Sequence, residues 1–392
     1  MPNSYDVAVI GLGAMGSATA YSLARRGHRV LAFDRWAPPH TLGSTHGRTR
    51  IIRVAYYEHP LYVPLVRRAY ELWAELEQAA GARLLHQTGG LMIGPADGVL
   101  VAGAQRSAEE HGIPHELLPV EEVRRRFPAY RPPDGAVALH EPRAGLLLPE
   151  ACIGAWHDLA RRHGAELRPG EPAERWRADG DGVAVTTARG SYHAGRLVLA
   201  AGPWTVELLP DLQLPLSVER QLFHWYQPAG APADFGPARC PIALWEYDAD
   251  RLFATFTDLG DGIKCGVHHE GEITTPDDVR RTVSEEETAE TAALLARIMP
   301  GAPGRLRDRA VCLYTNTPDH DFLIDVHPAH PQIVIASPCS GHGFKFASAL
   351  GEVIADLATG APAAFDLAPF RLSRPSMRPG AHPDAGAAVA AL

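Results

Sequence analysis

The pattern of apolar and small residues near the N-terminus predicts a strand, a glycine-rich turn, a helix and a second strand. Residues 5–10 form a short apolar run, and the sequence Gly-Leu-Gly-Ala-Met-Gly follows it directly. Small and apolar residues then recur at helical spacing over residues 14–26, and a second apolar run over residues 29–33 stops at Asp34. Together these segments predict a complete βαβ unit.

The rest of the chain alternates helical and strand-like patterns. Helical periodicity covers residues 65–79, 150–163, 284–298 and 343–359. An irregular, proline-containing stretch with a short strand at residues 90–93 follows the first of these helices. Further strands are predicted at residues 182–187, 191–198 and 332–336. Residues 215–311 mix strand-like segments with one helix, and we expect them to form a separate layer on the substrate side.

Length and composition narrow the class of protein. At 392 residues the chain is too long for one ordinary core, so two closely packed domains are expected. With 46% hydrophobic and 21% charged residues, the chain has the composition of a soluble globular protein. A net charge of -9 argues against nucleic acid as a partner, because phosphate neutralisation requires a concentrated basic surface.

Cysteine usage and the N-terminal sequence indicate the compartment. Five cysteines are scattered without a CxxC pair, which favours a reducing compartment and predicts neither a disulfide framework nor a metal site. The N-terminus lacks the basic region of a signal peptide, and no run of about 18 apolar residues is present. We therefore expect a cytoplasmic protein with no membrane partner.

The glycine turn carries a dinucleotide fingerprint in the correct context. Gly11, Gly13 and Gly16 follow a predicted strand and open a helix, so the backbone can turn tightly and approach a pyrophosphate. Asp34 lies 23 residues after Gly11, where an acid accepts hydrogen bonds from an adenosine ribose. We assign dinucleotide binding to Gly11, Gly13, Ala14, Met15, Gly16, Asp34, Arg35, Ala173 and Gly202.

The fingerprint alone does not distinguish NAD from FAD, since both present an adenosine pyrophosphate to the same unit. The strand LVLAAG, which ends at Gly202 and is followed by Pro203 and Trp204, is common in FAD proteins of this shape. A bare glycine turn without a nucleotide is the alternative. It is disfavoured because the fingerprint, its flanking elements and Asp34 agree.

Three longer segments resemble the monomeric sarcosine oxidase and N-methyltryptophan oxidase family, in the order and near the spacing of that family. They are STHGRTRIIR at residues 44–53, CLYTNTPD at 312–319 and SGHGFK at 340–345. The resemblance implies an α/β (α+β) fold, in which a Rossmann-type FAD domain of the glutathione-reductase type is interleaved with a mostly antiparallel substrate domain. It also implies oxidation of secondary or tertiary amino acids by dioxygen, which gives an imine and hydrogen peroxide.

From this resemblance we predict a discontinuous FAD-binding domain over residues 1–90, 145–215 and 312–375. Residues 91–144 and 216–311 are assigned to the substrate domain, and residues 376–392 to a frayed tail. The family also implies a monomer whose partners are a small amine and dioxygen.

The family places a covalent bond to the flavin at Cys312. A thiolate near cationic groups is nucleophilic, so the chemistry of the residue permits this bond; an inert buried thiol is the alternative. Ser44, His46, Thr49 and Arg50 match positions that line the flavin ring. On the other side of the ring the family places Gly341, His342, Gly343 and Lys345, at the start of the last predicted helix.

The family further implies the residues that act on the substrate. Arg53 and Lys345 would clamp its carboxylate, and Lys264 in GIKCGVH would assist dioxygen reduction by stabilising the developing negative charge. His268, Tyr314 and Arg50 complete the predicted catalytic set. No general base is evident, and a neutral amine can release hydride without one. Each of these cations could instead be an ordinary exposed side chain.

Two departures from the family leave the substrate open. The sequence Ser337-Pro338-Cys339 replaces a stretch of small and aromatic residues. Phe253 stands at the position of a tyrosine that lies near the substrate in sarcosine oxidases, and an alignment shifted by one residue is the alternative. A larger N-alkyl amino acid, a cyclic imino acid or an N-methylated metabolite would suit the same chemistry. A flavin dehydrogenase or N-demethylase with another electron acceptor, a nicotinamide-dependent dehydrogenase and a non-catalytic nucleotide-binding module are the alternative functions.

Overall fold

The predicted βαβ unit forms the centre of a parallel sheet. The structure, a computed structural model, describes residues 4–378. Strand β1 (Ser4–Ile10) lies in register with β2 (Val30–Asp34) on one side and β12 (Gly190–Leu199) on the other, and both pairs are parallel. Strands β9 (Glu166–Pro169) and β20 (His330–Ser337) extend the parallel sheet at its two sides. Its carboxyl ends therefore bring together the residues that follow β1, β2, β12 and β20.

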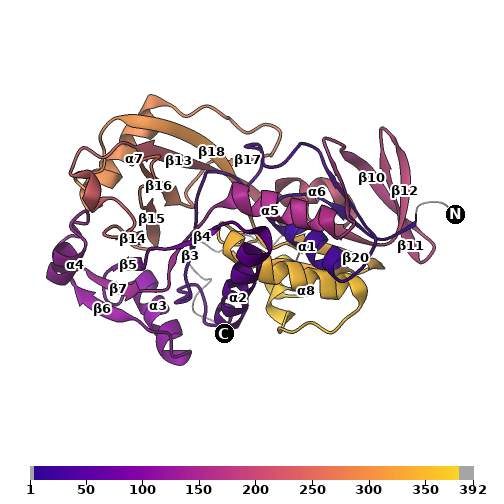
Figure 1. Cartoon of the computed structure of the whole chain (residues 1–392), viewed down its shortest axis with the longest axis horizontal. Helices are drawn as coiled ribbons and strands as arrows, with labels where there is room; N and C mark the ends of the chain where they lie inside the picture. The colour runs from indigo at the N-terminus through magenta and orange to yellow at the C-terminus, as the bar shows by residue number, and fades with distance from the viewer. Residues whose placement is uncertain (1–3, 379–392) are drawn as a thin grey trace.

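Helices cover this sheet and complete its core. Helix α1 (Ala14–Arg25) packs against α5 (Pro149–Arg162) and α8 (Ala347–Thr359), and α2 (Tyr62–Ala80) packs against α8. Strands β10 (Ala173–Asp179) and β11 (Gly182–Thr187) continue from β12 as an antiparallel extension, and β19 (Leu323–His327) pairs with β20. Figure 1 shows this half of the molecule on the right, with α1, α5 and α8 gathered beside the sheet.

A second, mostly antiparallel sheet forms the other half of the molecule (Figure 1). Its strand order is β17-β13-β16-β15-β14-β5-β7-β6, with β18 paired to β13. The bounds are β5 (Gly90–Gly94), β6 (Glu116–Pro119), β7 (Val137–Glu141), β13 (Ser217–Tyr226), β14 (Ile242–Asp248), β15 (Arg251–Phe256), β16 (Ile263–His268), β17 (Ile273–Thr274) and β18 (Leu306–Asn316). Helix α7 (Glu285–Ile298) begins at Ser284, where a capping box satisfies its first backbone N–H groups.

A small sheet connects the two halves. Strand β8 (Gly145–Leu147) pairs with β3 (Arg50–Ile52) and with β4 (Leu85–Gln87), and all three are antiparallel to their neighbours. Because β3 ends one residue before Arg53, this sheet fixes the backbone that carries the predicted Arg50 and Arg53. The family fold expected from the sequence, a Rossmann-type unit interleaved with an antiparallel sheet, is therefore confirmed.

The stretch described from sequence as irregular contains two helices, so that prediction was wrong. They are α3 (Val99–Glu110) and α4 (Val120–Arg126). Helix α3 carries Gly103 in its middle, which weakens the sequence signal because glycine is a poor helix former. The structure requires that glycine, since a Cβ atom there would lie 2.4 Å from the carbonyl oxygen of Tyr57.

Two predicted boundaries do not coincide with the ends of observed elements. The last helix begins at Ala347, after a 3-10 turn at Phe344–Phe346, because the chain folds back so tightly that a Cβ on Gly343 would lie 1.8 Å from the carbonyl oxygen of Pro338. The predicted domain boundary at residue 312 falls inside β18, which pairs with β13 as far as Asn316.

The prediction of a frayed tail from residue 376 was wrong for residues 376–378. A 3-10 turn spans Pro375–Met377, and Met377 is buried in a core cluster beside the parallel sheet. The Arg374 guanidinium forms an ion pair with Asp319. The remainder of the predicted tail lies outside the described residues. Within residues 4–378, no helix combines the length and apolar character that a membrane crossing requires.

Candidate functional site

One large cavity runs from the glycine turn of the parallel sheet to the inner face of the antiparallel sheet. Its volume is about 560 Å³, within the usual range for a cofactor or ligand site. The wall contains most of the residues predicted from the sequence: Gly11, Gly13, Ala14, Met15, Asp34, Arg35, Ser44, Arg50, Arg53, Ala173, Gly202, Lys264, His268, Tyr314, Gly341, His342, Gly343 and Lys345.

The glycine turn lets neighbouring backbone segments approach more closely than any side chain would permit. Gly11 has a φ of +100°, and a Cβ atom on it would lie 2.3 Å from the carbonyl oxygen of Ala200. A Cβ on Gly16, the one fingerprint glycine outside the wall, would lie 1.8 Å from the carbonyl oxygen of Gly11. Gly13 precedes α1 and gives it no side-chain cap, and of the first N–H groups that of Ala14 donates to Oγ1 of Thr45 at 3.3 Å. The first turn of α1 therefore presents N–H groups suited to a pyrophosphate.

Asp34 lies at the end of β2 and ties the turn to that strand. Its Oδ2 accepts a hydrogen bond from Leu12 N at 2.7 Å, and its Oδ1 accepts one from Trp36 N at 2.9 Å. Each carboxylate oxygen retains a second lone pair, so a ribose hydroxyl can still donate to it. The neighbouring Arg35 lies 3.3 Å from Asp277 of the antiparallel half. These contacts, together with the glycine turn that opens α1, fit the adenosine pyrophosphate of FAD.

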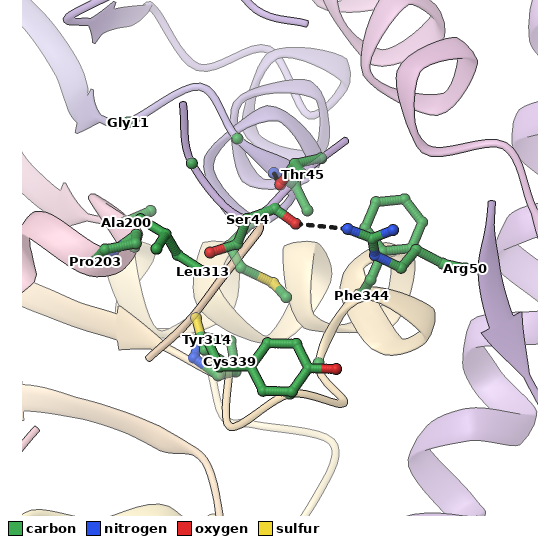
Figure 2. A pocket seen from close by; sticks show the side chains of 18 of the residues that line it. Gly11, Ser44, Thr45, Arg50, Ala200, Pro203, Leu313, Tyr314, Cys339 and Phe344 are labelled. Atoms are coloured by element: carbon green, nitrogen blue, oxygen red, sulfur yellow. Dashed lines mark hydrogen bonds between the residues drawn. The ribbon is translucent and has the colours of Figure 1, made fainter. Parts of the chain in front are cut away.

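Cys312 lies directly behind the cavity wall. Its Sγ is 3.5 Å from Nη2 of Arg50 and 3.6 Å from the carbonyl oxygen of Ser44, and both of those residues line the cavity. The guanidinium of Arg50 also donates to the Ser44 carbonyl at 3.0 Å, a hydrogen bond that Figure 2 shows above Tyr314 and Cys339.

Two predicted ring-lining side chains do not reach the wall. His46 is buried beside Phe223, and burial together with the charge of Arg50 lowers its pKa to about 3. Thr49 contributes its backbone instead, since its carbonyl oxygen accepts a hydrogen bond from Lys264. The structure therefore differs from the sequence prediction at these two positions, because the chain turns at Gly47 and places both side chains behind the loop.

Lys264 projects from β16 into the cavity and is almost fully buried, at 2% exposed. Its Nζ donates to the carbonyl oxygens of Gly47 at 2.8 Å and Thr49 at 2.7 Å, and lies 4.0 Å from the centre of the Phe223 ring. Burial and the nearby Arg50 hold the pKa of this ammonium well below its usual range. In its protonated form the group keeps one further N–H for a ligand in the cavity.

Arg53 and Lys345 bring two further cations to the cavity. Arg53 is 2% exposed and lies against the rings of Tyr56 and Tyr57, at 4.3 and 4.6 Å. The Nζ of Lys345 donates to the carbonyl oxygen of His342 at 2.8 Å and to the hydroxyl of Tyr56 at 3.3 Å. Burial, together with the charge of Arg53, lowers the pKa of Lys345 to about 7.

Glu58 is a cavity residue that the sequence analysis missed. Its Oε2 lies 2.6 Å from Nη2 of Arg53, and the ion pair holds the pKa of its carboxyl below the usual value despite the opposing effect of burial. An acid five residues after Arg53, in the same connecting segment, was the available signal. The buried carboxylate of Glu141 fastens that segment by accepting from Val54 N and Ala55 N.

His268 and Tyr314 form a pair on the cavity wall, with 3.1 Å between Nδ1 of His268 and the tyrosine hydroxyl. Burial holds the pKa of His268 well below its usual range and raises that of Tyr314, so both are neutral near pH 7. Gly341 lies so close to this pair that a Cβ atom on it would be 2.7 Å from the Tyr314 ring. His342 is hydrogen-bonded through Nδ1 to the Tyr56 hydroxyl at 2.6 Å.

The structure favours the one-residue shift that the sequence left open at Phe253. Phe253 is fully buried in the core of the antiparallel half, and the next residue, Ala254, lines the cavity. Successive side chains of a strand point to opposite faces, so an error of one residue reverses the assignment. Pro338 and Cys339, from the departing segment before Ser340, do line the cavity.

Comparison with known proteins agrees with this geometry. Residues 6–357 match the family model described as FAD dependent oxidoreductase. The chain is similar to monomeric sarcosine oxidase from Streptomyces avermitilis, with 44% identity over 91% of this chain and 94% of the relative. It is also similar to N-methyl-L-tryptophan oxidase from Salmonella typhimurium, with 37% identity over 94% of this chain and 99% of the relative.

Among solved structures, the open form of NikD, an unusual amino acid oxidase essential for nikkomycin biosynthesis, has a TM-score of 0.82 and 28% identity. The match covers 94% of this chain and 97% of that structure. The cavity, the glycine turn and these similarities identify FAD as the cofactor. The chain belongs to the family of FAD-dependent oxidoreductases that contains monomeric sarcosine oxidase and N-methyl-L-tryptophan oxidase.

Proposed function

We propose that this protein is an oxidase of secondary or tertiary amines that carry a carboxylate, such as N-methyl amino acids. The observation that carries the proposal is the convergence of Arg53, Lys345 and Lys264 on the cavity that also contains the FAD-type glycine turn. The names of the relatives, sarcosine oxidase and N-methyl-L-tryptophan oxidase, support the same class of substrate.

Bound FAD supplies the redox chemistry: it takes a hydride from a carbon next to nitrogen and passes two electrons to dioxygen. A secondary amine loses two electrons and two protons and becomes an imine, whereas a tertiary amine loses a hydride and becomes an iminium ion, whose hydrolysis releases the second proton. Dioxygen takes up the two electrons and two protons as hydrogen peroxide. Water then hydrolyses the imine to an aldehyde and a shorter amine. We assign FAD binding to the fingerprint residues, to Ser44, Arg50, Gly341, His342 and Gly343, and, through their backbone, to the segment of His46 and Thr49.

In this proposal Arg53 and Lys345 bind the substrate carboxylate and orient the molecule. A guanidinium can make two parallel hydrogen bonds to a carboxylate and so fix its plane, while the ammonium adds a point charge. The same positive field lowers the pKa of a bound amine, because a second positive charge nearby is unfavourable. The neutral amine that hydride transfer requires is thereby favoured without a general base.

Lys264 stabilises the negative charge that develops on dioxygen when the flavin is reoxidised. Its two backbone acceptors, Gly47 and Thr49, hold the ammonium in place, so it needs no reorganisation when negative charge develops on dioxygen. His268 and Tyr314 line the part of the cavity assigned to the substrate and offer hydrogen-bonding groups there.

We assign the covalent flavin bond to Cys312, whose sulfur lies beside Arg50. We further propose that the enzyme is a cytoplasmic monomer, since a relative is named monomeric sarcosine oxidase and the cysteines lack a CxxC pair.

The experiment combines an absorption spectrum with a peroxide assay. Purified protein is precipitated with acid beside Cys312→Ala, and each is then assayed for hydrogen peroxide with N-methyl amino acids in air. We expect yellow colour in the wild-type pellet only, and peroxide in proportion to substrate consumed. Colour without peroxide, combined with turnover in the presence of an artificial electron acceptor, would establish the dehydrogenase alternative instead.

A further inference from the structure

Glu150, in the first turn of α5, binds the backbone of the turn that precedes β3. Strands β3 and β8 are antiparallel, and Arg50 pairs with Leu147. Because α5 follows β8, continuing this register past the ends of both strands brings Glu150 opposite Gly47. Its Oε1 accepts hydrogen bonds from Gly47 N at 2.8 Å and from Arg48 N at 3.0 Å. The carboxylate therefore holds this turn through two backbone N–H groups.

A single peptide unit, between Gly47 and Arg48, joins Glu150 to Lys264. Its N–H group, that of Arg48, donates to the Glu150 carboxylate. Its carbonyl oxygen, that of Gly47, accepts from the Nζ of Lys264 at 2.8 Å. The N–H and C=O of a trans peptide point in opposite directions, so the carboxylate lies at the positive end of the peptide dipole and the ammonium at the negative end. Each hydrogen bond polarises the peptide and strengthens the other.

The turn that contains this peptide unit is strained and depends on support. Gly47 and Arg48 have φ values of 99° and 66°, both in the left-handed region. Thr49 N donates to the Gly47 carbonyl oxygen at 2.7 Å and closes a three-residue turn around Arg48, a type that is rare and strained. Rotation of the 47–48 peptide unit would relieve Arg48 and turn the Gly47 carbonyl oxygen away from Lys264. The hydrogen bonds to Glu150 oppose that rotation.

Glu150 also balances the charge of the buried Lys264 ammonium. The charged and titratable side chains that act on this ammonium are Arg48, Arg50, His46, Glu150, Cys265 and Cys312. Burial and the two guanidinium groups lower the pKa of Lys264, whereas Glu150 raises it. Burial lowers the pKa of His46 to about 3 and raises that of Cys265, so both are neutral near pH 7. Cys312 carries no charge in the proposed holoenzyme, where it is bonded to FAD, and Glu150 is then the anion of this set.

We infer that Glu150 is a positioning residue for Lys264: its carboxylate fixes the 47–48 peptide unit, which orients the ammonium, and it stabilises the protonated form of that ammonium. Glu150 does not line the cavity, so it acts through the turn. This inference rests on the proposed function, in which Lys264 stabilises negative charge on dioxygen. An ammonium that is already oriented and protonated needs no reorganisation when that charge develops.

The pH profile of flavin reoxidation tests the charge of Glu150. Glu150→Gln keeps an oxygen that can accept both N–H groups but removes the charge. Reduced holoenzyme is mixed with dioxygen in a stopped-flow instrument from pH 6 to pH 10. Reoxidation should slow as Lys264 loses its proton with rising pH, and the midpoint should lie at lower pH in Glu150→Gln. Each pH unit of that shift makes reoxidation about tenfold slower above both midpoints.

Asp158→Asn is the matched control, since Asp158 is an exposed acid on the same helix and pairs with Arg161. It should keep the wild-type midpoint. A midpoint in Glu150→Gln that equals that of the wild type would overturn the inference.

Glu150→Ala tests the orientation of the peptide unit, because it removes the acceptor itself. Hydrogen exchange of the Gly47 and Arg48 amides, followed by mass spectrometry, should be faster than in the wild type, whereas Glu150→Gln should stay close to the wild type. Reoxidation should slow by a factor of about 10 to 10², less than the loss of a charge stabiliser itself, while anaerobic reduction by substrate keeps its rate. Equal slowing of both half-reactions would reduce Glu150 to general support of the loop and overturn the inference. If Glu150→Ala retains no flavin, Glu150→Gln decides the kinetic part.

A double variant shows whether Glu150 acts through Lys264. In Lys264→Met, the further change Glu150→Gln should not slow reoxidation again, because the ammonium that it serves is absent. Slowing by the same factor as in the single variant would mean that Glu150 acts by another route, and would overturn the inference. The proposed function fails on a different result, which is the absence of oxidation of any N-methyl amino acid by the wild-type holoenzyme.

Discussion

The guanidinium of Arg53 lies 2.6 Å from the carboxylate of Glu58, so the cation assigned to the substrate already holds a carboxylate from its own segment. Both groups line the cavity, and the guanidinium is almost fully buried. A substrate carboxylate must therefore share Arg53 with Glu58 or displace it. The pair keeps a buried charge neutralised when the substrate is absent, at the cost of competition when it arrives.

Removing this competitor has two opposite consequences. Glu58→Gln should bind acetate more tightly at pH 6, because Arg53 no longer has an anionic partner. The same change should lower the free energy of unfolding by about 3 kcal/mol, since it leaves a buried guanidinium without its counter-charge. Flavin absorption titrations and denaturant unfolding measure the two effects. Glu58→Asp keeps the charge and is the control; unchanged acetate affinity in Glu58→Gln would show that Glu58 does not compete.

The ammonium of Lys345 should impose a pH dependence on carboxylate binding. Burial and the charge of Arg53 lower its pKa to about 7, so the group is protonated below that pH and neutral above it. Only the protonated form attracts an anion, and the affinity for acetate should therefore fall by up to about tenfold per pH unit above pH 7. An amine-free ligand is used because its own charge stays constant over this range.

Lys345→Met supplies the comparison for that profile. The variant should bind acetate weakly at pH 6 and show little further loss up to pH 9, because the titrating cation is gone. A profile that keeps the wild-type slope in Lys345→Met would assign the titration to another group. Arg53 is not such a group, since burial is outweighed there by Glu58 and its pKa is raised.

Most of the fold could be predicted from the sequence because its signals are local. The βαβ unit is encoded by two apolar runs, three glycines and Asp34 within one short segment, and the structure agrees with it closely. The helix α3 was missed for the opposite reason. Its central Gly103 is dictated by a contact with the backbone of Tyr57, a long-range constraint that local periodicity cannot reveal.

The cavity shows the same division between local and distant information. Arg53, Lys264 and Lys345 stood out as charged residues within recognisable segments, and the cavity contains all three. Ala254 carried no such signal, and the charge of Glu58 stands outside any recognisable motif. The first depends on which face of a strand points inward, and the second on an ion pair within an irregular segment. Thr49 was assigned for its side chain, yet the structure uses its carbonyl oxygen.

The glycine turn gives a prediction with a matched control. Gly11→Ala should abolish flavin binding, because the new Cβ would lie 2.3 Å from the carbonyl oxygen of Ala200 in a backbone conformation with φ of +100°. Gly27→Ala has a similar φ of +87° but no atom within 4 Å of the new Cβ. It should cost about 1 to 2 kcal/mol of stability and keep the flavin. Flavin absorbance per protein measures both variants, and retention of flavin by Gly11→Ala would contradict the assigned turn.

The assignment of Lys264 to the oxygen reaction is tested by separating the two half-reactions. Lys264→Met keeps an apolar chain of similar length but removes the ammonium that Gly47 and Thr49 hold in place. Anaerobic reduction of the flavin by substrate should remain near the wild-type rate, because Arg53 and Lys345 are untouched. Reoxidation by dioxygen, followed in a stopped-flow instrument, should slow by a factor of about 10² to 10³, the usual effect of removing one preorganised charge stabiliser.

Lys345→Met is the matched control, since it removes a cation that binds the substrate and should weaken substrate binding without slowing reoxidation. Normal reoxidation in Lys264→Met would transfer this role to Arg50, the other cation beside the Gly47 loop.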